Sequence, residues 1–271
     1  MNHKERLAEL LRAITRNSGR SRVFEHFLIM QAAAISNRFS RGDFANERES
    51  RFLEIISKYK REDIKLFVDC AADLILALED CIGQKCLRVN APPFAEIGFD
   101  IQFPIAGTKP HFGDVLGDIF SETGLNEQSN GQVFTPKFAA DLMANLAMND
   151  EIIDGEIERN GFIGLVEPCC GSGVIIFEGL NRLLERGINP QRQSVVIASD
   201  TDERCVLMTY IQLSFYGIPA IVQQKDAITG AELSPPWLTP MFVHDKWAAR
   251  VRNYEPPKIL PPEPAGQLTL F

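Results

Sequence analysis

The hydrophobic residues in the first third of the chain recur at the three- and four-residue spacing of helices. This pattern predicts helices around residues 7–17, 23–38, 49–59 and 64–78. Prolines and glycines then interrupt any regular period, which indicates a connecting segment. Residues 1–110 therefore predict a helical N-terminal unit and connector, and no catalytic constellation is visible in the helices.

Two further helical patterns follow the connector. The first covers residues 115–120, and the second begins after a polar loop. Thr135 suits the N-cap of this second helix and Pro136 its first helical position. Its first-turn N–H groups could therefore hold a carboxylate. The apolar seam of the helix consists of Ala139, Leu142, Met143 and Leu146.

The pattern changes to alternating strands and helices after residue 161. A short apolar run ends at Glu167, a glycine turn follows, and a helical pattern starts at once. The next strand, residues 194–198, leads to Asp200, and a third, residues 220–223, leads to Asp226. Parallel strands joined by helices predict an α/β fold with a Rossmann-like sheet. All three acidic tips should then lie at the same edge of that sheet.

The glycine turn is the first candidate site. It consists of Cys170, Gly171, Ser172 and Gly173. Glycine suits this position because a side chain would block a ligand's approach to the backbone, and because the turn can need a positive φ. Acidic residues at neighbouring strand tips suit ribose hydroxyls. A dinucleotide site is the alternative, but the chain has no GxGxxG run before its first helix in this part.

Composition narrows the class of protein. The chain has 271 residues, 45% of them hydrophobic and 24% charged, which is ordinary for a globular protein. No apolar run approaches the length of a membrane span, and the N-terminus is too charged for a signal peptide. The six cysteines and four histidines do not show zinc spacing. We therefore expect a cytoplasmic protein with reduced thiols, no membrane contact and no structural metal.

Charge is unevenly distributed. The net charge is −8, yet residues 1–60 hold 12 Lys/Arg and 7 Asp/Glu, a balance of +5. The remainder therefore carries 16 basic and 29 acidic residues, a balance of −13. A basic segment joined to an acidic domain fits a contact with a polyanion, while a solvated helix face is the simpler alternative.

Four motifs carry a family resemblance: DVLGDIF at 114–120, GQVFTP at 131–136, VEPCCGSG at 166–173 and KDA at 225–227. In this order they resemble the adenine-N6 DNA methyltransferases, and more narrowly the modification subunits of type I restriction systems. The resemblance covers under half of the chain. It implies an S-adenosylmethionine-dependent methyltransferase domain over residues 111–250, with DNA as substrate and a partner subunit for target recognition.

The resemblance also implies site residues. Phe134, Thr135 and Pro136 match the motif that touches the methionine end of S-adenosylmethionine. Glu167 and the turn formed by Cys170, Gly171, Ser172 and Gly173 match the main cofactor loop. Asp200 matches the acid that binds the ribose, and Asp226 the residue that faces the adenine amino group. Two departures are Glu167, where aspartate is commoner, and Val174, where a further glycine is usual.

The catalytic motif departs further from the family pattern, which is Asn or Asp, two prolines, then Tyr or Phe after an apolar strand. The one segment that matches in part is Ser234-Pro235-Pro236-Trp237, whose tryptophan could stack on a flipped base. A serine variant is familiar among cytosine-N4 methyltransferases. The alternative is a Pro-Pro surface turn.

Three functions therefore remain open. The chain could be a DNA methyltransferase, a cofactor-binding accessory protein without catalysis, or a methyltransferase acting on RNA or protein.

The C-terminal tail, residues 251–271, is proline-rich and predicts an extended linker. It ends in Gln267, Leu268, Thr269, Leu270 and Phe271. These residues resemble the short peptide with which bacterial DNA enzymes dock on the replication sliding clamp. The alternative is that the tail packs on its own domain.

Overall fold

The computed structural model describes residues 2–14, 19–39, 43–83, 110–123 and 135–252. The N-terminal helices are α1 (His3–Ile14), α2 (Arg20–Ser36), α3 (Asp43–Ser57) and α4 (Arg61–Ile82), followed by α5 (Val115–Glu122), α6 (Lys137–Ala147) and α7 (Asp150–Asn160). The α/β part contains β1 (Ile163–Glu167), α8 (Val174–Glu185), α9 (Pro190–Gln193), β2 (Ser194–Asp200), α10 (Glu203–Phe215), β3 (Ala220–Gln224), β4 (Trp237–Leu238), α11 (Pro240–His244) and α12 (Trp247–Val251).

The described strands form one sheet in the order β1-β2-β3-β4. β1, β2 and β3 are parallel, whereas β4 pairs antiparallel with β3. The helices α8 and α10 supply the crossovers that parallel strands require. The predicted α/β fold, a Rossmann-like sheet preceded by a helical unit, is confirmed.

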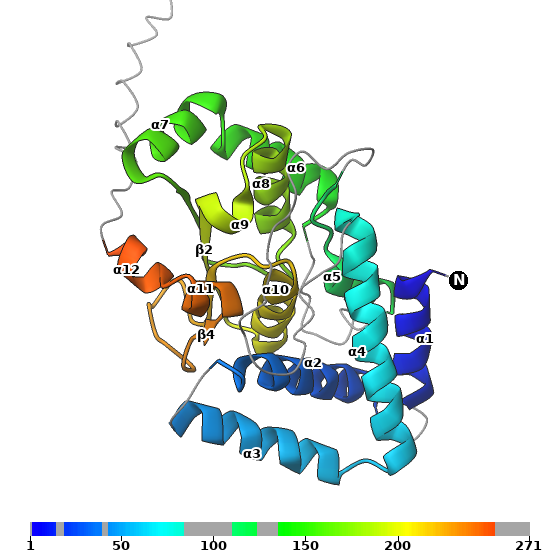
Figure 1. Cartoon of the computed structure of the whole chain (residues 1–271). Helices are drawn as coiled ribbons and strands as arrows, with labels where there is room; N and C mark the ends of the chain where they lie inside the picture. Colours follow the sequence, from blue (N-terminus) through cyan, green and yellow to red (C-terminus); the bar gives the residue numbers. More distant parts are fainter. Residues whose placement is uncertain (1, 15–18, 40–42, 84–109, 124–134, 253–271) are drawn as a thin grey trace, which may run out of the picture.

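The helix α10 lies between the sheet and the N-terminal helices (Figure 1). All residues from Cys205 to Phe215 are buried, as expected for a helix covered on every side. One hydrophobic core runs from Leu7 in α1 through α10 to Trp237 in β4. The helical unit is thus packed directly on α10, which lies against the sheet.

The two faces of the sheet are covered unequally. Alternate residues point to opposite faces, so Val196 joins the main core while Val195 packs with Trp247 of α12. Nearer the carboxyl ends of the strands, Val166 and Ile197 on this second face are exposed. An apolar part of the sheet therefore lies open beside the acidic strand tips.

The helix α6 differs from its prediction in two ways. It begins at Lys137 with Pro136 as its N-cap, so Thr135 lies one residue before the cap. Its predicted seam faces solvent, with Leu146 71% exposed, while Ala140 and Ala144 are buried. Alanines allow α6 to approach α8 closely, at a point where a Cβ on Gly179 would lie 3.0 Å from the Met148 sulfur. Close packing of small residues has therefore overridden the larger apolar ones.

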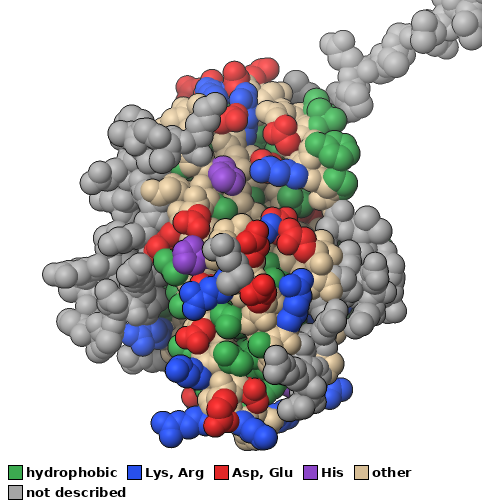
Figure 2. All heavy atoms as spheres, turned by 90° about the vertical axis from the view of Figure 1, so that its right-hand side faces the viewer, with side chains coloured by type: hydrophobic (Ala, Val, Ile, Leu, Met, Phe, Trp, Pro, Cys, Tyr) green, Lys and Arg blue, Asp and Glu red, His purple; other side chains and the backbone are tan. Residues whose placement is uncertain are grey.

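Figure 2 shows Lys, Arg, Asp and Glu side chains interspersed over the face where α1 and α4 lie. Lys4 pairs there with Asp118 and Glu122 at 3.1 and 2.8 Å. On this face, the excess of basic residues in the N-terminal sequence does not form a patch of one sign.

Candidate functional site

The turn between β1 and α8 has the backbone that its glycines predict. Gly171 and Gly173 have φ values of 54° and 108°, in the left-handed region. A Cβ on Gly173 would also lie 2.9 Å from a ring carbon of Phe177 and 3.3 Å from the Thr209 hydroxyl. Position 173 therefore needs glycine both for its conformation and for its packing.

The acidic tip of β2 holds this turn. The Gly171 N–H donates to Asp200 Oδ2 at 2.9 Å, and the Cys170 N–H donates to the Ser199 carbonyl at 2.8 Å. At the tip of β1, Glu167 Oε1 accepts a hydrogen bond from the Cys169 N–H at 3.0 Å. The structure thus brings Glu167, the glycine turn and Asp200 into one hydrogen-bonded group.

Asp226 follows the neighbouring strand tip. The Lys225 N–H donates to the Asp200 carbonyl at 2.9 Å, which fixes the ends of β2 and β3 together. Asp226 Oδ1 accepts from the N–H groups of Ile228 and Thr229 at 2.8 and 3.2 Å. Hydrogen bonds from the Thr229 side chain and from these N–H groups hold the pKa of Asp226 below its usual value. Asp226 is therefore an ionised carboxylate at neutral pH.

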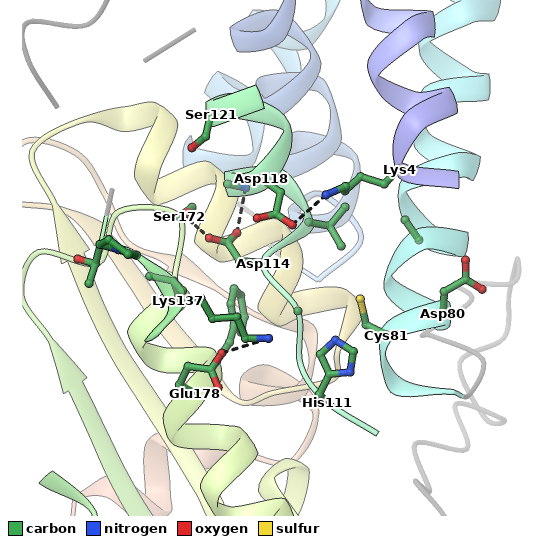
Figure 3. A pocket seen from close by; sticks show the side chains of 18 of the residues that line it. Lys4, Asp80, Cys81, His111, Asp114, Asp118, Ser121, Lys137, Ser172 and Glu178 are labelled. Carbon is green, nitrogen blue, oxygen red and sulfur yellow. Dashed lines mark hydrogen bonds and ion pairs between the residues drawn. The ribbon is translucent and has the colours of Figure 1, made fainter. Parts of the chain in front are cut away.

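Two hollows lie near the turn, and Ser172 of the turn lines the larger one. The smaller, about 230 Å³, lies along the open part of the sheet and is lined by Glu167, Ser199, Gln223 and Lys225, with Val166 and Ile197 on its floor. The larger, about 500 Å³, lies where α1, α4, α5, α6 and α8 converge (Figure 3). Its volume is in the range of small-molecule sites.

The larger cavity joins the predicted methionine-end motif to the turn. Thr135, Pro136 and Ser172 all line it. Figure 3 shows Lys137 and Glu178 directed toward one another on its wall, with Lys137 Nζ 3.7 Å from Glu178 Oε1. The cavity thus offers a cation, a carboxylate and the start of a helix in one place. Phe134 lies outside the described residues.

The two cysteines of the turn differ in environment. Cys170 is buried, and burial raises the pKa of its thiol, so it stays protonated at neutral pH. Cys169 is exposed. Cys170 therefore acts as a small packing residue. In the described part of the chain, no group of three or more His, Cys, Asp or Glu side chains is arranged to hold a metal ion.

The candidate catalytic segment lies at the other edge of the sheet from β1. Trp237 pairs with Val222 of β3 and is only 7% exposed. Its ring lies against Tyr210, with 5.2 Å between centroids, and the Arg48 guanidinium is 3.7 Å from its centroid. Arg48 also donates to the Pro236 carbonyl at 2.9 Å. The ring and carbonyl that a base would use already contact the protein.

The rest of this segment has similar contacts. The Ser234 carbonyl accepts a hydrogen bond from Gln223 Nε2 at 3.3 Å, and the Ser234 hydroxyl is 3.5 Å from the Pro235 carbonyl. The segment thus lies at the β4 edge of the sheet, whereas Glu167 and the glycine turn lie at the β1 edge. A catalytic role for the segment stays a prediction.

The structure adds a residue that the sequence reasoning did not assign to the site. Asp114 caps α5 and accepts a hydrogen bond from the Ser172 hydroxyl in the turn. The sequence contained one sign of this, an acidic N-cap followed three residues later by Gly117.

Two other predictions concern the tail and the membrane. The tail, with Gln267 to Phe271, lies outside the described residues. Among the helices that are described, none has the length and apolar character needed to cross a membrane.

No protein-family model matches the chain, and no curated protein matches its sequence. Among solved structures, it is similar to a type I restriction-modification methyltransferase subunit from Streptococcus thermophilus, with 16% identity and a TM-score of 0.37 over 86% of this chain. The match covers 59% of that subunit. It is also similar to a Listeria monocytogenes protein provisionally assigned as a class I S-adenosylmethionine-dependent methyltransferase, with 10% identity and a TM-score of 0.40, over 94% of this chain and 71% of that one. At these TM-scores neither structure identifies the function of this chain.

Proposed function

We propose that the chain binds S-adenosylmethionine and takes part in methyl transfer to an exocyclic amine of a DNA base, with adenine N6 as the expected target. One observation carries the proposal. The glycine turn is held by Asp200 beside the tips that carry Glu167 and Asp226. Ser172 of the turn lines the larger hollow, and Glu167 lines the smaller one. This arrangement offers separate contacts for the two ends of a nucleoside joined to an amino acid.

The hydrogen-bond acceptors at the strand tips fit the nucleoside end. Ribose hydroxyls donate hydrogen bonds, and the carboxylates of Glu167 and Asp200 accept them. The exocyclic amino group of adenine is a donor as well, which suits the ionised Asp226. The smaller hollow has exposed Val166 and Ile197 along it, and an aromatic base would cover them. Polar acceptors beside an apolar floor are the usual composition of such sites.

The larger cavity fits the amino-acid end. A carboxylate would be held by Lys137 and by the first-turn N–H groups of α6, which begins at Lys137 after its N-cap Pro136. An ammonium group would be held by Glu178, which is buried and already faces a cation. Thr135, Ser172 and, as expected from the sequence, Phe134 would complete this end. When bound, S-adenosylmethionine supplies an electrophilic methyl group on a sulfonium.

A second function, cofactor binding without transfer, is favoured by the surroundings of Trp237. Arg48 covers its ring and occupies the Pro236 carbonyl. If this arrangement persists with DNA, catalytic groups must come from a partner subunit, and the chain alone would act as an accessory protein.

One experiment separates these functions. The full chain is titrated with S-adenosylmethionine by calorimetry, and the same preparation is assayed for transfer of labelled methyl groups to unmethylated DNA. Binding with transfer supports the methyltransferase, and binding without transfer supports the accessory protein. The absence of binding contradicts both. Asp200→Ala should abolish binding, whereas Asp154→Ala, an exposed acid of α7 paired with Arg186, is a matched control and should bind normally.

The proposed partners have a separate test. We expect DNA as the acceptor and a partner subunit for target recognition, and the five residues from Gln267 to Phe271 fit a bacterial sliding clamp. Leu268, Leu270 and Phe271 would fill an apolar groove while Gln267 adds hydrogen bonds. Deleting these five residues should abolish a clamp pull-down and leave cofactor affinity unchanged. Retained pull-down would contradict the clamp assignment.

A further inference from the structure

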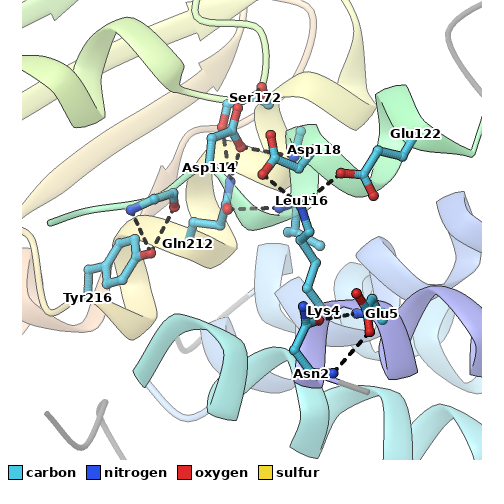
Figure 4. A network of polar contacts seen from close by, with 12 residues as sticks. Asn2, Lys4, Glu5, Asp114, Leu116, Asp118, Glu122, Ser172, Gln212 and Tyr216 are labelled. Carbon is cyan, nitrogen blue, oxygen red and sulfur yellow. Dashed lines mark hydrogen bonds and ion pairs between the residues drawn. The ribbon is translucent and has the colours of Figure 1, made fainter. Parts of the chain in front are cut away.

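A partly buried carboxylate, that of Asp114, connects α5 to the glycine turn (Figure 4). Asp114 Oδ1 accepts from the Gly117 N–H at 2.9 Å and from Gln212 Nε2 at 3.1 Å. Asp114 Oδ2 accepts from the Ser172 hydroxyl. Three donors from three segments thus converge on one side chain, and one of them belongs to the turn.

The hydrogen bond between Asp114 and Ser172 requires glycine at position 117. A Cβ on Gly117 would lie 2.1 Å from Asp114 Oδ2 and 2.3 Å from the Ser172 hydroxyl. Any side chain at position 117 would therefore displace the carboxylate or the serine. Glycine at the third position after the cap leaves the space in which the Asp114–Ser172 hydrogen bond forms.

The buried helix α10 supports the same turn from the other side. Gln212 Nε2 donates to the Ser172 carbonyl at 3.1 Å, and its Oε1 accepts from the Leu116 N–H at 3.0 Å. The Thr209 hydroxyl donates to the Gly171 carbonyl at 3.0 Å. Polar groups of α5 and α10 therefore fix the hydroxyl and carbonyl of Ser172 and the carbonyl of Gly171.

The partners of Asp114 in this network are neutral. Burial raises the pKa of its carboxyl group, and the donors from Ser172, Gln212 and Gly117 oppose that rise by stabilising the charged form. Removing this carboxylate takes the acceptor away from the Gly117 N–H and the Ser172 hydroxyl, whereas Gln212 Nε2 keeps the Ser172 carbonyl. Such a loss of partners is costly. Asp114 thus has a strong influence on the conformation of the turn.

We propose that Asp114 is a positioning residue that holds the cofactor loop in its binding shape through Ser172. The inference rests on the proposed function only in taking S-adenosylmethionine as the ligand. Asp114 also lines the larger cavity. The role proposed for it is exerted through its hydrogen bond with Ser172. Its removal allows the Ser172 hydroxyl and the backbone of Gly171–Gly173 to adopt other conformations, and the ligand must then bear the cost of ordering them.

Another acid on α5 provides the control. Glu122 pairs with Lys4 at 2.8 Å, but its side chain is 58% exposed and does not line either hollow. Exposed ion pairs contribute little to stability. Glu122→Gln therefore removes one negative charge from the same helix without disturbing the buried network.

The test is a double-mutant cycle in the full chain. Asp114→Asn and Ser172→Ala are made singly and together, and S-adenosylmethionine affinity is measured by calorimetry. Each single variant should weaken binding about tenfold, since each disrupts a hydrogen bond to a charged group. The double variant should be no weaker than the worse single one, because both changes act on the same contact. Glu122→Gln should bind within about twofold of wild type.

Hydrogen exchange of the peptide containing Cys170–Gly173 gives a readout without ligand. Asp114→Asn and Ser172→Ala should each speed exchange in this peptide, while exchange in α2 stays unchanged. If Asp114→Asn does not fold, Ser172→Ala, which removes only a hydroxyl group, supplies the same comparison. Wild type that fails to bind the cofactor contradicts the proposed function, and exchange then still tests the loop. Unchanged exchange, or additive effects on affinity, would overturn the positioning role.

Discussion

Replacing Trp237 by alanine distinguishes a structural tryptophan from one that stacks on a base. The side chain is 7% exposed, lies in the main core and contacts Tyr210 and Arg48. Removing a buried tryptophan costs roughly 3–5 kcal/mol in unfolding free energy. For a domain of this size each kcal/mol lowers the melting temperature by roughly 2–4 °C. We therefore expect Trp237→Ala to melt on the order of 10 °C below wild type.

The other tryptophan is a matched control. Trp247 is fully buried, packs on Phe162, and has Arg250 3.6 Å from its ring centroid. Trp247→Ala should lower the melting temperature, measured by circular dichroism, by a similar amount. If wild type transfers methyl groups, both variants are then assayed at a temperature where each is folded, and each should retain transfer. Trp237→Ala that melts like wild type but has lost transfer would refute the structural role and support base stacking.

Three further outcomes follow from named contacts. Gly173→Ala should lower stability and cofactor affinity more than Gly187→Ala does. Both glycines have positive φ, but of the two only Gly173 lacks room for a Cβ. Equal effects of the two substitutions on melting temperature and on calorimetric affinity would contradict this. Iodoacetamide should label Cys169 and spare Cys170 in the native protein, as mass spectrometry can show. Burial, with nearby cations, lowers the pKa of His26, so the unfolded chain binds more protons below about pH 6.5 and stability should fall as pH falls through that value. His26→Gln should make the unfolding free energy, measured by urea denaturation, depend less on pH. An unchanged pH dependence would contradict this role of His26.

The strand tips and the turn could be predicted because their signals are local. An apolar run, an acidic residue and a glycine pair occur within a dozen residues around Glu167, and the structure places β1, the turn and α8 there. The tips at Asp200 and Asp226 follow from the same βαβ repeat. Helix existence was equally clear for α1, α2, α3 and α4, since their hydrophobic faces extend over several turns.

Which residues of different helices and strands pack against one another could not be predicted from the local sequence pattern. Leu142 and Leu146 form the stronger apolar face of α6, yet Ala140 and Ala144 are the buried ones, because contact with α8 depends on how closely two helices approach. The burial of Trp237 depends on Arg48, which is 189 residues earlier in the chain. Asp114 likewise reaches Ser172 across 58 residues. Such contacts arise only when the helical unit and the sheet share one core.

The most direct test of the central claim, that the acidic strand tips bind S-adenosylmethionine, is a calorimetric titration of wild type beside Asp226→Ala. Asp226 is the most informative position because it does not hold the glycine turn, so its removal leaves the hydrogen bond between Gly171 and Asp200 in place. We predict saturable binding at one site per wild-type chain and clearly weaker binding by the variant. No heat with wild type, or equal affinity of the two proteins, would contradict the assignment.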